Sequence, residues 1–325
     1  MDMKKMISVL SLTLGLFVSV GLTACGGESD SEDSFIPVDG EQVYMSDYQA
    51  TFTFINGAKE VELTKATDQM GSIPEYVDYK GKQFRVTRIG DRSCQHLQYA
   101  FSDIPEGVVS IGEEAFEYHK ATSIKLPSTL KTIGAGAFSY NNNLENIAIP
   151  NGVTVIEPNT FLYDKVLSTV TIPSSVIEIK EAAFVNCGFT SLTIPGNVLT
   201  IGVRAYANCA QLKTLVLEDG VKNIGEEAFS QCEKLESVVI PQSVTAIESE
   251  AFFCGRHGTS AGEPFVEDTG ALTSVTSKIR EPFPISEFVF GSLLQNGGTL
   301  YVPKGTAEKY KATEGWKEIK NIVEQ

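Results

Sequence analysis

The stretch Ile111-Gly112-Glu113-Glu114-Ala115-Phe116 decides the fold, because near-copies of it recur every 22 or 23 residues along the chain. A second close copy is Ile224-Gly225-Glu226-Glu227-Ala228-Phe229. The remaining copies begin at Ile89, Ile133, Ile156, Ile179, Ile201 and Ile247. So regular a period predicts a solenoid, in which each repeat buries its apolar side only against its neighbours. A solenoid is first of all a long surface, so the pattern favours binding over catalysis.

Each repeat also contains two short segments with strand character. Ser123-Ile124-Lys125-Leu126-Pro127 alternates polar and apolar residues, which predicts a half-buried strand that its proline ends. A second short strand, Thr129 to Ile133 in the same repeat, leads into the anchoring isoleucine. We expect the glycine that follows the isoleucine to allow a tight bend. The alanine and phenylalanine should then pack inward, with the phenylalanines forming a stacked column in the core.

One slot in the repeat carries small polar residues or cysteine. Eight residues after the anchoring isoleucine, successive repeats place His119, Asn141, Asp164, Cys187, Cys209 and Cys232. This alternation predicts an internal ladder of small side chains that face backbone amides. Disulfides between adjacent rungs are possible in an exported protein. However, five cysteines follow Cys25, and three consecutive rungs cannot all pair, so buried free thiols are favoured. The spacing does not suit zinc.

The start of the chain predicts export. Lys4 and Lys5 precede an apolar run from Ile7 to Val20, which is typical of a secretory signal peptide over residues 1–24. Leu22-Thr23-Ala24-Cys25 resembles the lipobox of bacterial lipoproteins, which implies that Cys25 is acylated and anchors the chain to a membrane. Residues 25–34 are acidic and predict a flexible tether. This acidic stretch is similar to the surface-export signal of Bacteroidetes lipoproteins.

The repeat itself resembles the BspA-like class of leucine-rich repeats from about Val86 to Cys254. Gln231 to Pro241 fits the consensus of that class nearly position for position, with leucine, alternating isoleucine or valine, and a closing proline. The chain departs from this consensus at several positions. Glu218 replaces the proline, Cys94 replaces a phenylalanine, and the glycine is replaced by Glu157, Lys180 and Glu248. The resemblance implies a β-rich solenoid built from leucine-rich repeats of 22–23 residues.

The segments outside the repeat predict caps at both ends. Residues 35–84 contain turn signals at Asn56-Gly57 and Lys80-Gly81 between strand-like runs, which predicts a small all-β N-terminal cap. We assign 85–275 to the solenoid, with an insertion at 255–270, and 276–325 to a short helical C-terminal cap that includes Tyr310 and Trp316. Insertions in repeat proteins map to loops and often carry binding residues.

Composition and motifs argue against several functions. The chain has 26 basic and 41 acidic residues, a net charge of −15, which disfavours nucleic acid and bare anionic membrane as partners. Gly258 to Gly262 forms a G-x-S-x-G pattern beside His257, but nothing supplies the strand-to-helix elbow that such a serine needs. We find no P-loop, dinucleotide fingerprint or H-E-x-x-H motif. The sequence therefore predicts a protein that is not an enzyme and that takes no cofactor and no metal.

The leading hypothesis is a lipid-anchored outer-membrane protein, exposed at the cell surface, that binds a protein partner. The resemblance implies a partner in the host extracellular matrix or on another bacterium. Candidate ligand-binding residues lie on the outward strand face and in the insertion: Lys125, Thr171, Thr193, Val216, Val239, Arg256, His257 and Phe265. The strand strip lacks aromatic residues, so the hypothesis that it is merely a solvated face carries equal weight.

Two further hypotheses place the chain in a different role. The first is a glycan-binding lipoprotein of a polysaccharide-uptake system, and the second is a periplasmic structural or assembly protein. A glycan site would be expected to show clustered Trp or Tyr, and the chain has one Trp, which counts against the first of these.

Overall fold

The computed structural model describes residues 37–98, 100–254, 270–286, 288–291 and 297–325, all of which belong to the unit Pro37–Gln325. The lipidation candidate Cys25, the acidic tether and the G-x-S-x-G pattern lie outside the described residues, as do Arg256, His257 and Phe265.

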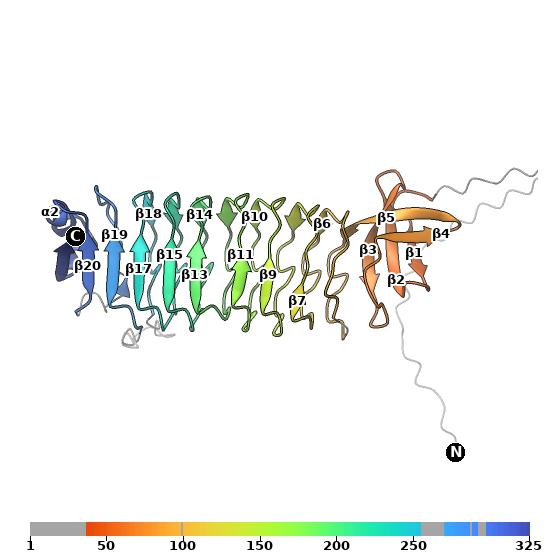
Figure 1. Cartoon of the computed structure of the whole chain (residues 1–325), viewed down its shortest axis with the longest axis horizontal. Helices are drawn as coiled ribbons and strands as arrows, with labels where there is room; N and C mark the ends of the chain where they lie inside the picture. The colour runs from red at the N-terminus through yellow and green to blue at the C-terminus, as the bar shows by residue number, and fades with distance from the viewer. Residues whose placement is uncertain (1–36, 99, 255–269, 287, 292–296) are drawn as a thin grey trace, which may run out of the picture. The chain divides into compact units, whose positions relative to one another are not determined.

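The repeats form a β-solenoid, as the periodicity predicts (Figure 1). Each repeat contributes two short strands, and each strand pairs in parallel with its equivalent in a neighbouring repeat. The first set of strands is β7 (Ser123–Ile124), β9 (Asn146–Ala148), β11 (Thr169–Thr171), β13 (Ser191–Ile194), β15 (Thr214–Leu217), β17 (Ser237–Ile240), β19 (Ser274–Ser277), β20 (Thr299–Val302) and β21 (Asn321–Glu324). The second set is β6 (Ser110–Ile111), β8 (Thr132–Ile133), β10 (Val155–Ile156), β12 (Glu178–Ile179), β14 (Thr200–Ile201), β16 (Asn223–Ile224) and β18 (Ala246–Ile247).

The anchoring isoleucines set the register of the second strand set. Ile156 pairs with Ile179, Ile179 with Ile201, and the series continues to Ile247. These strands are shorter than the sequence predicts, because Thr132–Ile133 alone forms β8 within the expected Thr129 to Ile133. The preceding residues form a turn, in which the amide of Leu130 donates to the carbonyl of Pro127 at 3.2 Å.

The aromatic column expected in the core is present. Phe116, Phe138, Phe161, Phe184, Tyr206, Phe229, Phe252 and Phe290 stack in sequence with ring centroids 4.9 to 5.6 Å apart and planes within 10° of parallel. Seven of these eight rings are among the core side chains that are almost wholly removed from solvent, and Phe290 is 4% exposed. Each repeat thus buries its largest side chain between the equivalent side chains of its two neighbours.

The repeat glycine has a different role from the bend that the sequence suggests. A Cβ atom on Gly134 would lie 2.6 Å from backbone atoms of the preceding repeat, and one on Gly225 would lie 2.7 Å away. The glycine therefore permits close approach of two backbones. The left-handed backbone falls two residues later, for example at Glu114 with φ of 51° and Glu227 with φ of 55°.

Glu157 and Lys180 replace the repeat glycine in two neighbouring repeats, and their side chains form an ion pair. Lys180 Nζ lies 2.8 Å from Glu157 Oε2, with both side chains about one-third exposed. The hydrogen bond to Glu157 and its charge raise the pKa of Lys180. Replacement of the glycine is therefore accompanied by a compensating contact between adjacent rungs.

The polar slot forms the internal ladder that the sequence predicts. The backbone N–H of His119 donates to Asn141 Oδ1 at 2.6 Å, and the N–H of Asn141 donates to Asp164 Oδ1 at 2.7 Å. In the later repeats the thiols of Cys187 and Cys209 donate to the carbonyls of column residues in preceding repeats, at 3.2 and 3.3 Å. The slot therefore changes from amide and carboxyl groups to thiols partway along the solenoid.

The cysteines after Cys25 are buried, and Cys94, Cys187, Cys209 and Cys232 are free thiols, as favoured from the sequence. Burial raises the pKa of the Cys209 thiol to about 12, although a hydrogen bond from the Cys187 backbone acts in the opposite direction. A thiol with so high a pKa is protonated at neutral pH and is a poor nucleophile. These cysteines are therefore packing residues.

From residue 37 onward, where the described structure begins, five strands precede the first regular repeats: β1 (Gln42–Met45), β2 (Ala50–Ile55), β3 (Glu60–Ala66), β4 (Tyr76–Tyr79) and β5 (Lys82–Ile89). β1, β2 and β3 pair antiparallel, and β4 pairs antiparallel with β5, so both expected turns join antiparallel strands. β5 also pairs in parallel with β3 on one side and with β6 on the other. One continuous sheet therefore runs from these N-terminal strands into the solenoid.

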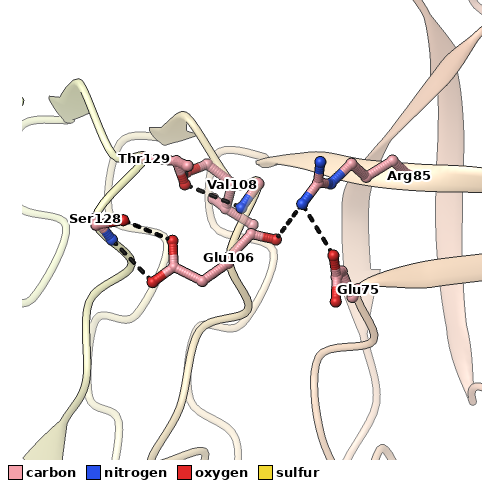
Figure 2. Close-up of polar contacts among 7 residues, drawn as sticks. Glu75, Arg85, Glu106, Val108, Ser128 and Thr129 are labelled. Carbon is pink, nitrogen blue, oxygen red and sulfur yellow. Dashed lines mark hydrogen bonds and ion pairs between the residues drawn. The ribbon is translucent and has the colours of Figure 1, made fainter.

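Arg85 of β5 ties this sheet to the first repeat turns (Figure 2). Its Nη2 atom donates to Glu75 Oε1 at 2.9 Å and to the backbone carbonyl of Glu106 at 3.2 Å. The carboxylate of Glu106 accepts two further hydrogen bonds from Ser128, which lower the pKa of Glu106. A chain of polar contacts thus crosses from β5 into two successive turns.

Gly107 at this junction should not tolerate a side chain. Its φ is +100°, and a Cβ atom there would lie 2.2 Å from Arg85 Nε. We therefore expect Gly107→Ala to lower the free energy of unfolding by about 1–3 kcal/mol, measured by urea denaturation. Gly71→Ala is the matched control, because Gly71 has ordinary φ and open space around it. Equal denaturation midpoints for the two variants would contradict this account.

At the C-terminal end the first strand set continues beyond the recognisable repeats. β19, β20 and β21 pair in parallel with β17 and with one another. The short elements α2 (Ala307–Ala312) and η1 (Trp316–Glu318) carry Tyr310 and Trp316, both fully buried. Trp316 Nε1 donates to the Phe283 carbonyl at 2.9 Å, and Tyr310 Oη lies 2.6 Å from Ser277 Oγ.

Candidate functional site

Three of the predicted binding residues lie side by side on the outward face of the first strand set. Thr193 of β13 pairs with Val216 of β15, and Val216 pairs with Val239 of β17. Thr193 and Val216 are exposed, and Val239 is half-buried. Their neighbours along each strand point inward, as Leu215 and Val238 are almost fully buried. The pleat of the strands thus sorts apolar core residues from a line of outward side chains.

The structure extends this line in the C-terminal direction. Val239 pairs with Thr276 of β19, Thr276 pairs with Tyr301 of β20, and Tyr301 pairs with Val323 of β21. We call the line Thr193, Val216, Val239, Thr276, Tyr301 and Val323 the strand strip. The expectation of a strip without aromatic residues is incomplete, because Tyr301 belongs to the same registered line. The six strands lie side by side in one sheet (Figure 1).

The other two predicted strand residues lie in a different sheet. Thr171 belongs to β11, which pairs with β9 and through it with β7, while Lys125 directly follows β7 and forms a single bridge with Asp103. Both side chains are exposed. The structure shows no backbone pairing between β11 and β13 among these strands, so Lys125 and Thr171 do not continue the strand strip by hydrogen-bonded register.

A second surface feature, which was not predicted from the sequence, is a row of stacked aromatic side chains in the turns after the second strand set. His96 stacks on Tyr118 at 4.6 Å between ring centroids, Tyr118 on Tyr140 at 4.8 Å, and Tyr140 on Tyr163 at 5.2 Å. The planes lie within 13° of parallel. We call these four residues the tyrosine row. Unlike the core column, Tyr118 is 40% exposed and Tyr163 is 36% exposed.

The four residues of the tyrosine row have a backbone conformation that residues with large side chains rarely adopt. The φ angles of His96, Tyr118, Tyr140 and Tyr163 lie between 56° and 64°. Later repeats place Asn186 and Asn208 at the same slot with φ of 59°. Asparagine tolerates this left-handed conformation far better than tyrosine does. The tyrosines are therefore not what the backbone alone would select.

A hollow of about 320 Å³ lies beside the row. Its lining combines the aromatic side chains with amides and a lysine: His96, Gln98, Tyr118, His119, Lys120, Tyr140, Asn142 and Asn143. Lys120 hydrogen-bonds Gln98, and Asn143 Nδ2 donates to the carbonyl of Lys120 at 3.2 Å. The row and its hollow therefore join aromatic edges, hydrogen-bonding amides and one cation across three repeats.

The buried histidine of this region, His119, has structural surroundings. His119 is buried, stacks on Phe101 and accepts a hydrogen bond from the Phe101 amide at its Nε2 atom, 3.1 Å away. Burial lowers the pKa of His119 to about 4, so it is neutral at physiological pH. In the described ranges there is no group of three or more His, Cys, Asp or Glu side chains that could hold a metal ion.

The tyrosine row does have a signal in the sequence. Tyr118, Tyr140 and Tyr163 each lie seven residues after an anchoring isoleucine, and His96 holds the same position in the first repeat. Alignment of every slot of the repeat brings them into one column. The chain has one Trp, but the stacked tyrosines present a row of aromatic edges and hydroxyl groups along the solenoid.

Comparison with known proteins identifies the repeat. The family model described as BspA type Leucine rich repeat region matches six copies, over residues 87–213 and 177–259. A search of curated proteins found no match. No helix in the described part of the chain combines the length and apolarity that a membrane crossing requires.

Several crystal structures are similar to this chain. A leucine rich cell surface protein from Faecalibacterium prausnitzii is 22% identical, with 88% of this chain and 95% of that chain covered and a TM-score of 0.46. A leucine-rich repeat protein from Bacteroides ovatus is 21% identical over 85% and 75% of the two chains, with a TM-score of 0.47. The pneumococcal vaccine antigen PcpA is 17% identical over 89% and 100%, with a TM-score of 0.49.

The family match covers more than half of the chain, and the structure shows the stacked strands, aromatic column and polar slot of its repeats. The chain therefore belongs to the family of BspA type leucine-rich repeat proteins.

Proposed function

We propose that this protein is a surface-displayed binding scaffold that holds a protein partner along the strand strip. The observation that supports this most directly is the unbroken register from Thr193 to Val323 over six hydrogen-bonded strands. Val216 is 45% exposed and Val323 is 38% exposed, so apolar surface lies open along this line. A rigid sheet of this kind lets a partner gain many weak contacts without reordering the scaffold.

Tyr301 supplies the strip with a residue type that is enriched at protein interfaces. Tyrosine, tryptophan and arginine dominate interface energetics. Tyrosine in particular supplies a large contact area with little loss of conformational entropy. Tyr301 lies between Thr276 and Val323 in register, towards one end of the strip. The strip thus combines a flat, mildly apolar surface with one candidate anchor. Lys125 and Thr171, in the neighbouring sheet, are proposed as peripheral contacts.

The proposal includes a location. The signal-like residues 1–24 and the lipobox-like Leu22 to Cys25 support export and acylation at Cys25. The acidic residues 25–34 would then join the anchor to the repeats. This arrangement would place the solenoid at the outer face of the outer membrane, where a host matrix protein or another bacterium is within reach. The insertion residues Arg256, His257 and Phe265 are kept as a second candidate contact.

A charge placed on the strip should abolish most of the binding. We expect Val216→Glu to weaken binding to immobilised host matrix proteins or to partner bacteria by about tenfold or more, because it buries an unpaired carboxylate in the interface. Val203→Glu is the matched control, since Val203 is similarly exposed (38%) and lies outside the strip. Surface plasmon resonance with the purified chain measures both. Equal losses for the two variants would refute the strip as the binding surface.

Location is tested separately by protease shaving of intact cells, followed by mass spectrometry of repeat peptides. Release of these peptides while periplasmic controls stay protected is the expected result. Full protection would contradict surface display and would favour a periplasmic structural role. A Cys25→Ser variant should leave the chain unacylated and soluble, which distinguishes anchoring from exposure.

A further inference from the structure

We propose that the tyrosine row and the adjoining hollow form a second binding site, for a linear neutral polysaccharide that runs along the solenoid axis with one sugar per repeat. The site is separate from the strand strip, since its residues lie in the turns after the second strand set. It therefore stands or falls independently of the protein-binding proposal.

The distance between successive rings of the tyrosine row is the reason for choosing a polysaccharide as the ligand. Each repeat presents one aromatic side chain, and successive rings are 4.6, 4.8 and 5.2 Å apart. An extended chain of β-1,4-linked pyranose sugars advances by close to this length per sugar and turns alternate sugars over, so every second repeat would meet an equivalent part of the ligand. An extended peptide advances about 3.3 Å per residue, so its residues fall out of step with the repeats.

The chemistry of the row also suits a sugar. Because the rings stack face to face, their edges and hydroxyl groups are the parts left to solvent. Within the described residues the structure shows no hydrogen bond to the hydroxyls of Tyr118, Tyr140 or Tyr163. A phenol is both a donor and an acceptor, as is a sugar hydroxyl. The row thus offers an evenly spaced line of unpaired hydroxyl groups beside apolar ring edges.

The hollow adds the amides that sugar recognition needs. Asn142 and Asn143 are exposed, and their Nδ2 atoms donate to the carbonyls of Tyr140 and Lys120, so each contributes its oxygen and its second N–H to the hollow. The carboxamide of Gln98 is already hydrogen-bonded at both ends, to Lys120 and to the carbonyl of His96. Carboxamides donate and accept at once, which matches vicinal hydroxyls. The net charge of −15 argues against a polyanionic glycan and in favour of a neutral one.

The left-handed backbone of the row is a feature of the repeat, because Asn186, Asn208 and Gln231 share it at the same slot. Tyrosine at φ near 60° is disfavoured, whereas the asparagines of later repeats occupy the same slot with less strain. The substitution Tyr→Asn therefore removes the aromatic row while keeping a residue that the repeat already uses at this slot.

Affinity electrophoresis of the purified chain tests the inference, with hydroxyethyl cellulose, glucomannan and arabinoxylan in the gel and heparin as the anionic comparison. We expect at least one neutral polysaccharide to retard the wild-type chain. The double variant Tyr118→Asn, Tyr140→Asn should lose about tenfold or more in affinity and should unfold at a similar urea concentration. The matched control is Asn186→Ala, Asn208→Ala, which changes the same slot outside the row and should bind normally.

Three results would overturn the inference. The first is that none of the neutral polysaccharides retards the wild-type chain. The second is that the tyrosine variant binds as well as the asparagine control. The third is that the tyrosine variant loses the protein partners of the strand strip while no polysaccharide binds, which would make the row a protein contact. The variant Val216→Glu should leave polysaccharide binding intact, and this separates failure of the two sites.

Discussion

Replacing Phe184 with alanine is expected to lower the free energy of unfolding by about 3–5 kcal/mol, the range for deletion of a buried aromatic ring. Phe184 is fully buried and lies between Phe161 at 5.1 Å and Tyr206 at 4.9 Å, with Phe189 against its edge at 5.8 Å. No side chain of a neighbouring repeat can move into the gap without leaving its own position in the column. The cavity should therefore persist, and the cost should lie at the upper part of the range.

Urea denaturation followed by circular dichroism measures this effect, and Tyr206→Phe is its control within the same column. Tyr206 is fully buried, and its hydroxyl has no hydrogen-bond partner among the described residues. Removing that hydroxyl should therefore leave stability unchanged or raise it by about 1 kcal/mol, while the ring stays in place. A Phe184→Ala variant as stable as Tyr206→Phe would show that the column does not hold the repeats together.

The same variant should also reveal how far the disturbance spreads. Each repeat contacts only its neighbours, so stability in a solenoid is a sum of local terms. Hydrogen exchange should accelerate first in the amides that pair the flanking repeats, such as those of β12 and β14. Amides in β1 to β3 should keep their protection. Uniform acceleration over the whole chain would contradict this nearest-neighbour picture.

The periodic part of the fold could be predicted from the sequence because each slot has one dominant physical constraint. An isoleucine that must pair with an isoleucine, and a phenylalanine that must stack on a phenylalanine, recur whatever the neighbouring residues are. The ladder of Asn141 and Asp164 was predictable for the same reason, since small hydrogen-bonding side chains recur at one slot. Burial of the cysteines followed from their sharing that slot.

The features that could not be predicted lie where the period ends or where the reason for a residue is tertiary. The strand character of Leu300 to Val302 is visible in the sequence, but its register is not, because this segment lacks the isoleucine–glycine signature. The place of Tyr301 on the strand strip therefore could not be predicted from the pattern alone. The sequence locates the repeat glycine correctly. It does not show why glycine is needed there, because the backbone that excludes a side chain belongs to the preceding repeat. The left-handed φ of Tyr140 likewise could not be predicted from the sequence.

Replacing Asp164 with asparagine is expected to stabilise the protein at neutral pH and to remove part of its pH dependence. Asp164 is fully buried, and its Oδ2 atom has no hydrogen-bond partner within the described part of the chain, while Oδ1 accepts a hydrogen bond from the amide of Asn141. Burial raises the pKa of Asp164 well above its usual range, against the opposing effect of that hydrogen bond. Asparagine keeps the accepting oxygen without a charge to desolvate, so we expect a gain of about 1–3 kcal/mol at pH 7.

The sign of the pH dependence follows from this raised pKa. In the unfolded chain Asp164 loses its proton near pH 4, but in the folded chain it holds the proton to higher pH. Its contribution to stability is therefore complete below pH 4 and is lost as the pH rises towards the folded pKa. The difference between Asp164→Asn and wild type should accordingly be small at pH 4 and grow towards pH 7, as measured by urea midpoints at each pH.

The reciprocal change supplies the control for this pH effect. Asn141→Asp places a second carboxyl group in the same buried ladder, one repeat away from Asp164. It should be tolerated at pH 4, where both acids are protonated, and should destabilise the chain progressively above that pH. Asp47→Asn, at an exposed position, should leave the profile unchanged. If Asp164→Asn and Asp47→Asn gave the same pH profile, Asp164 would have to be ionised in the fold, and the ladder would need a compensating charge that the described residues do not contain.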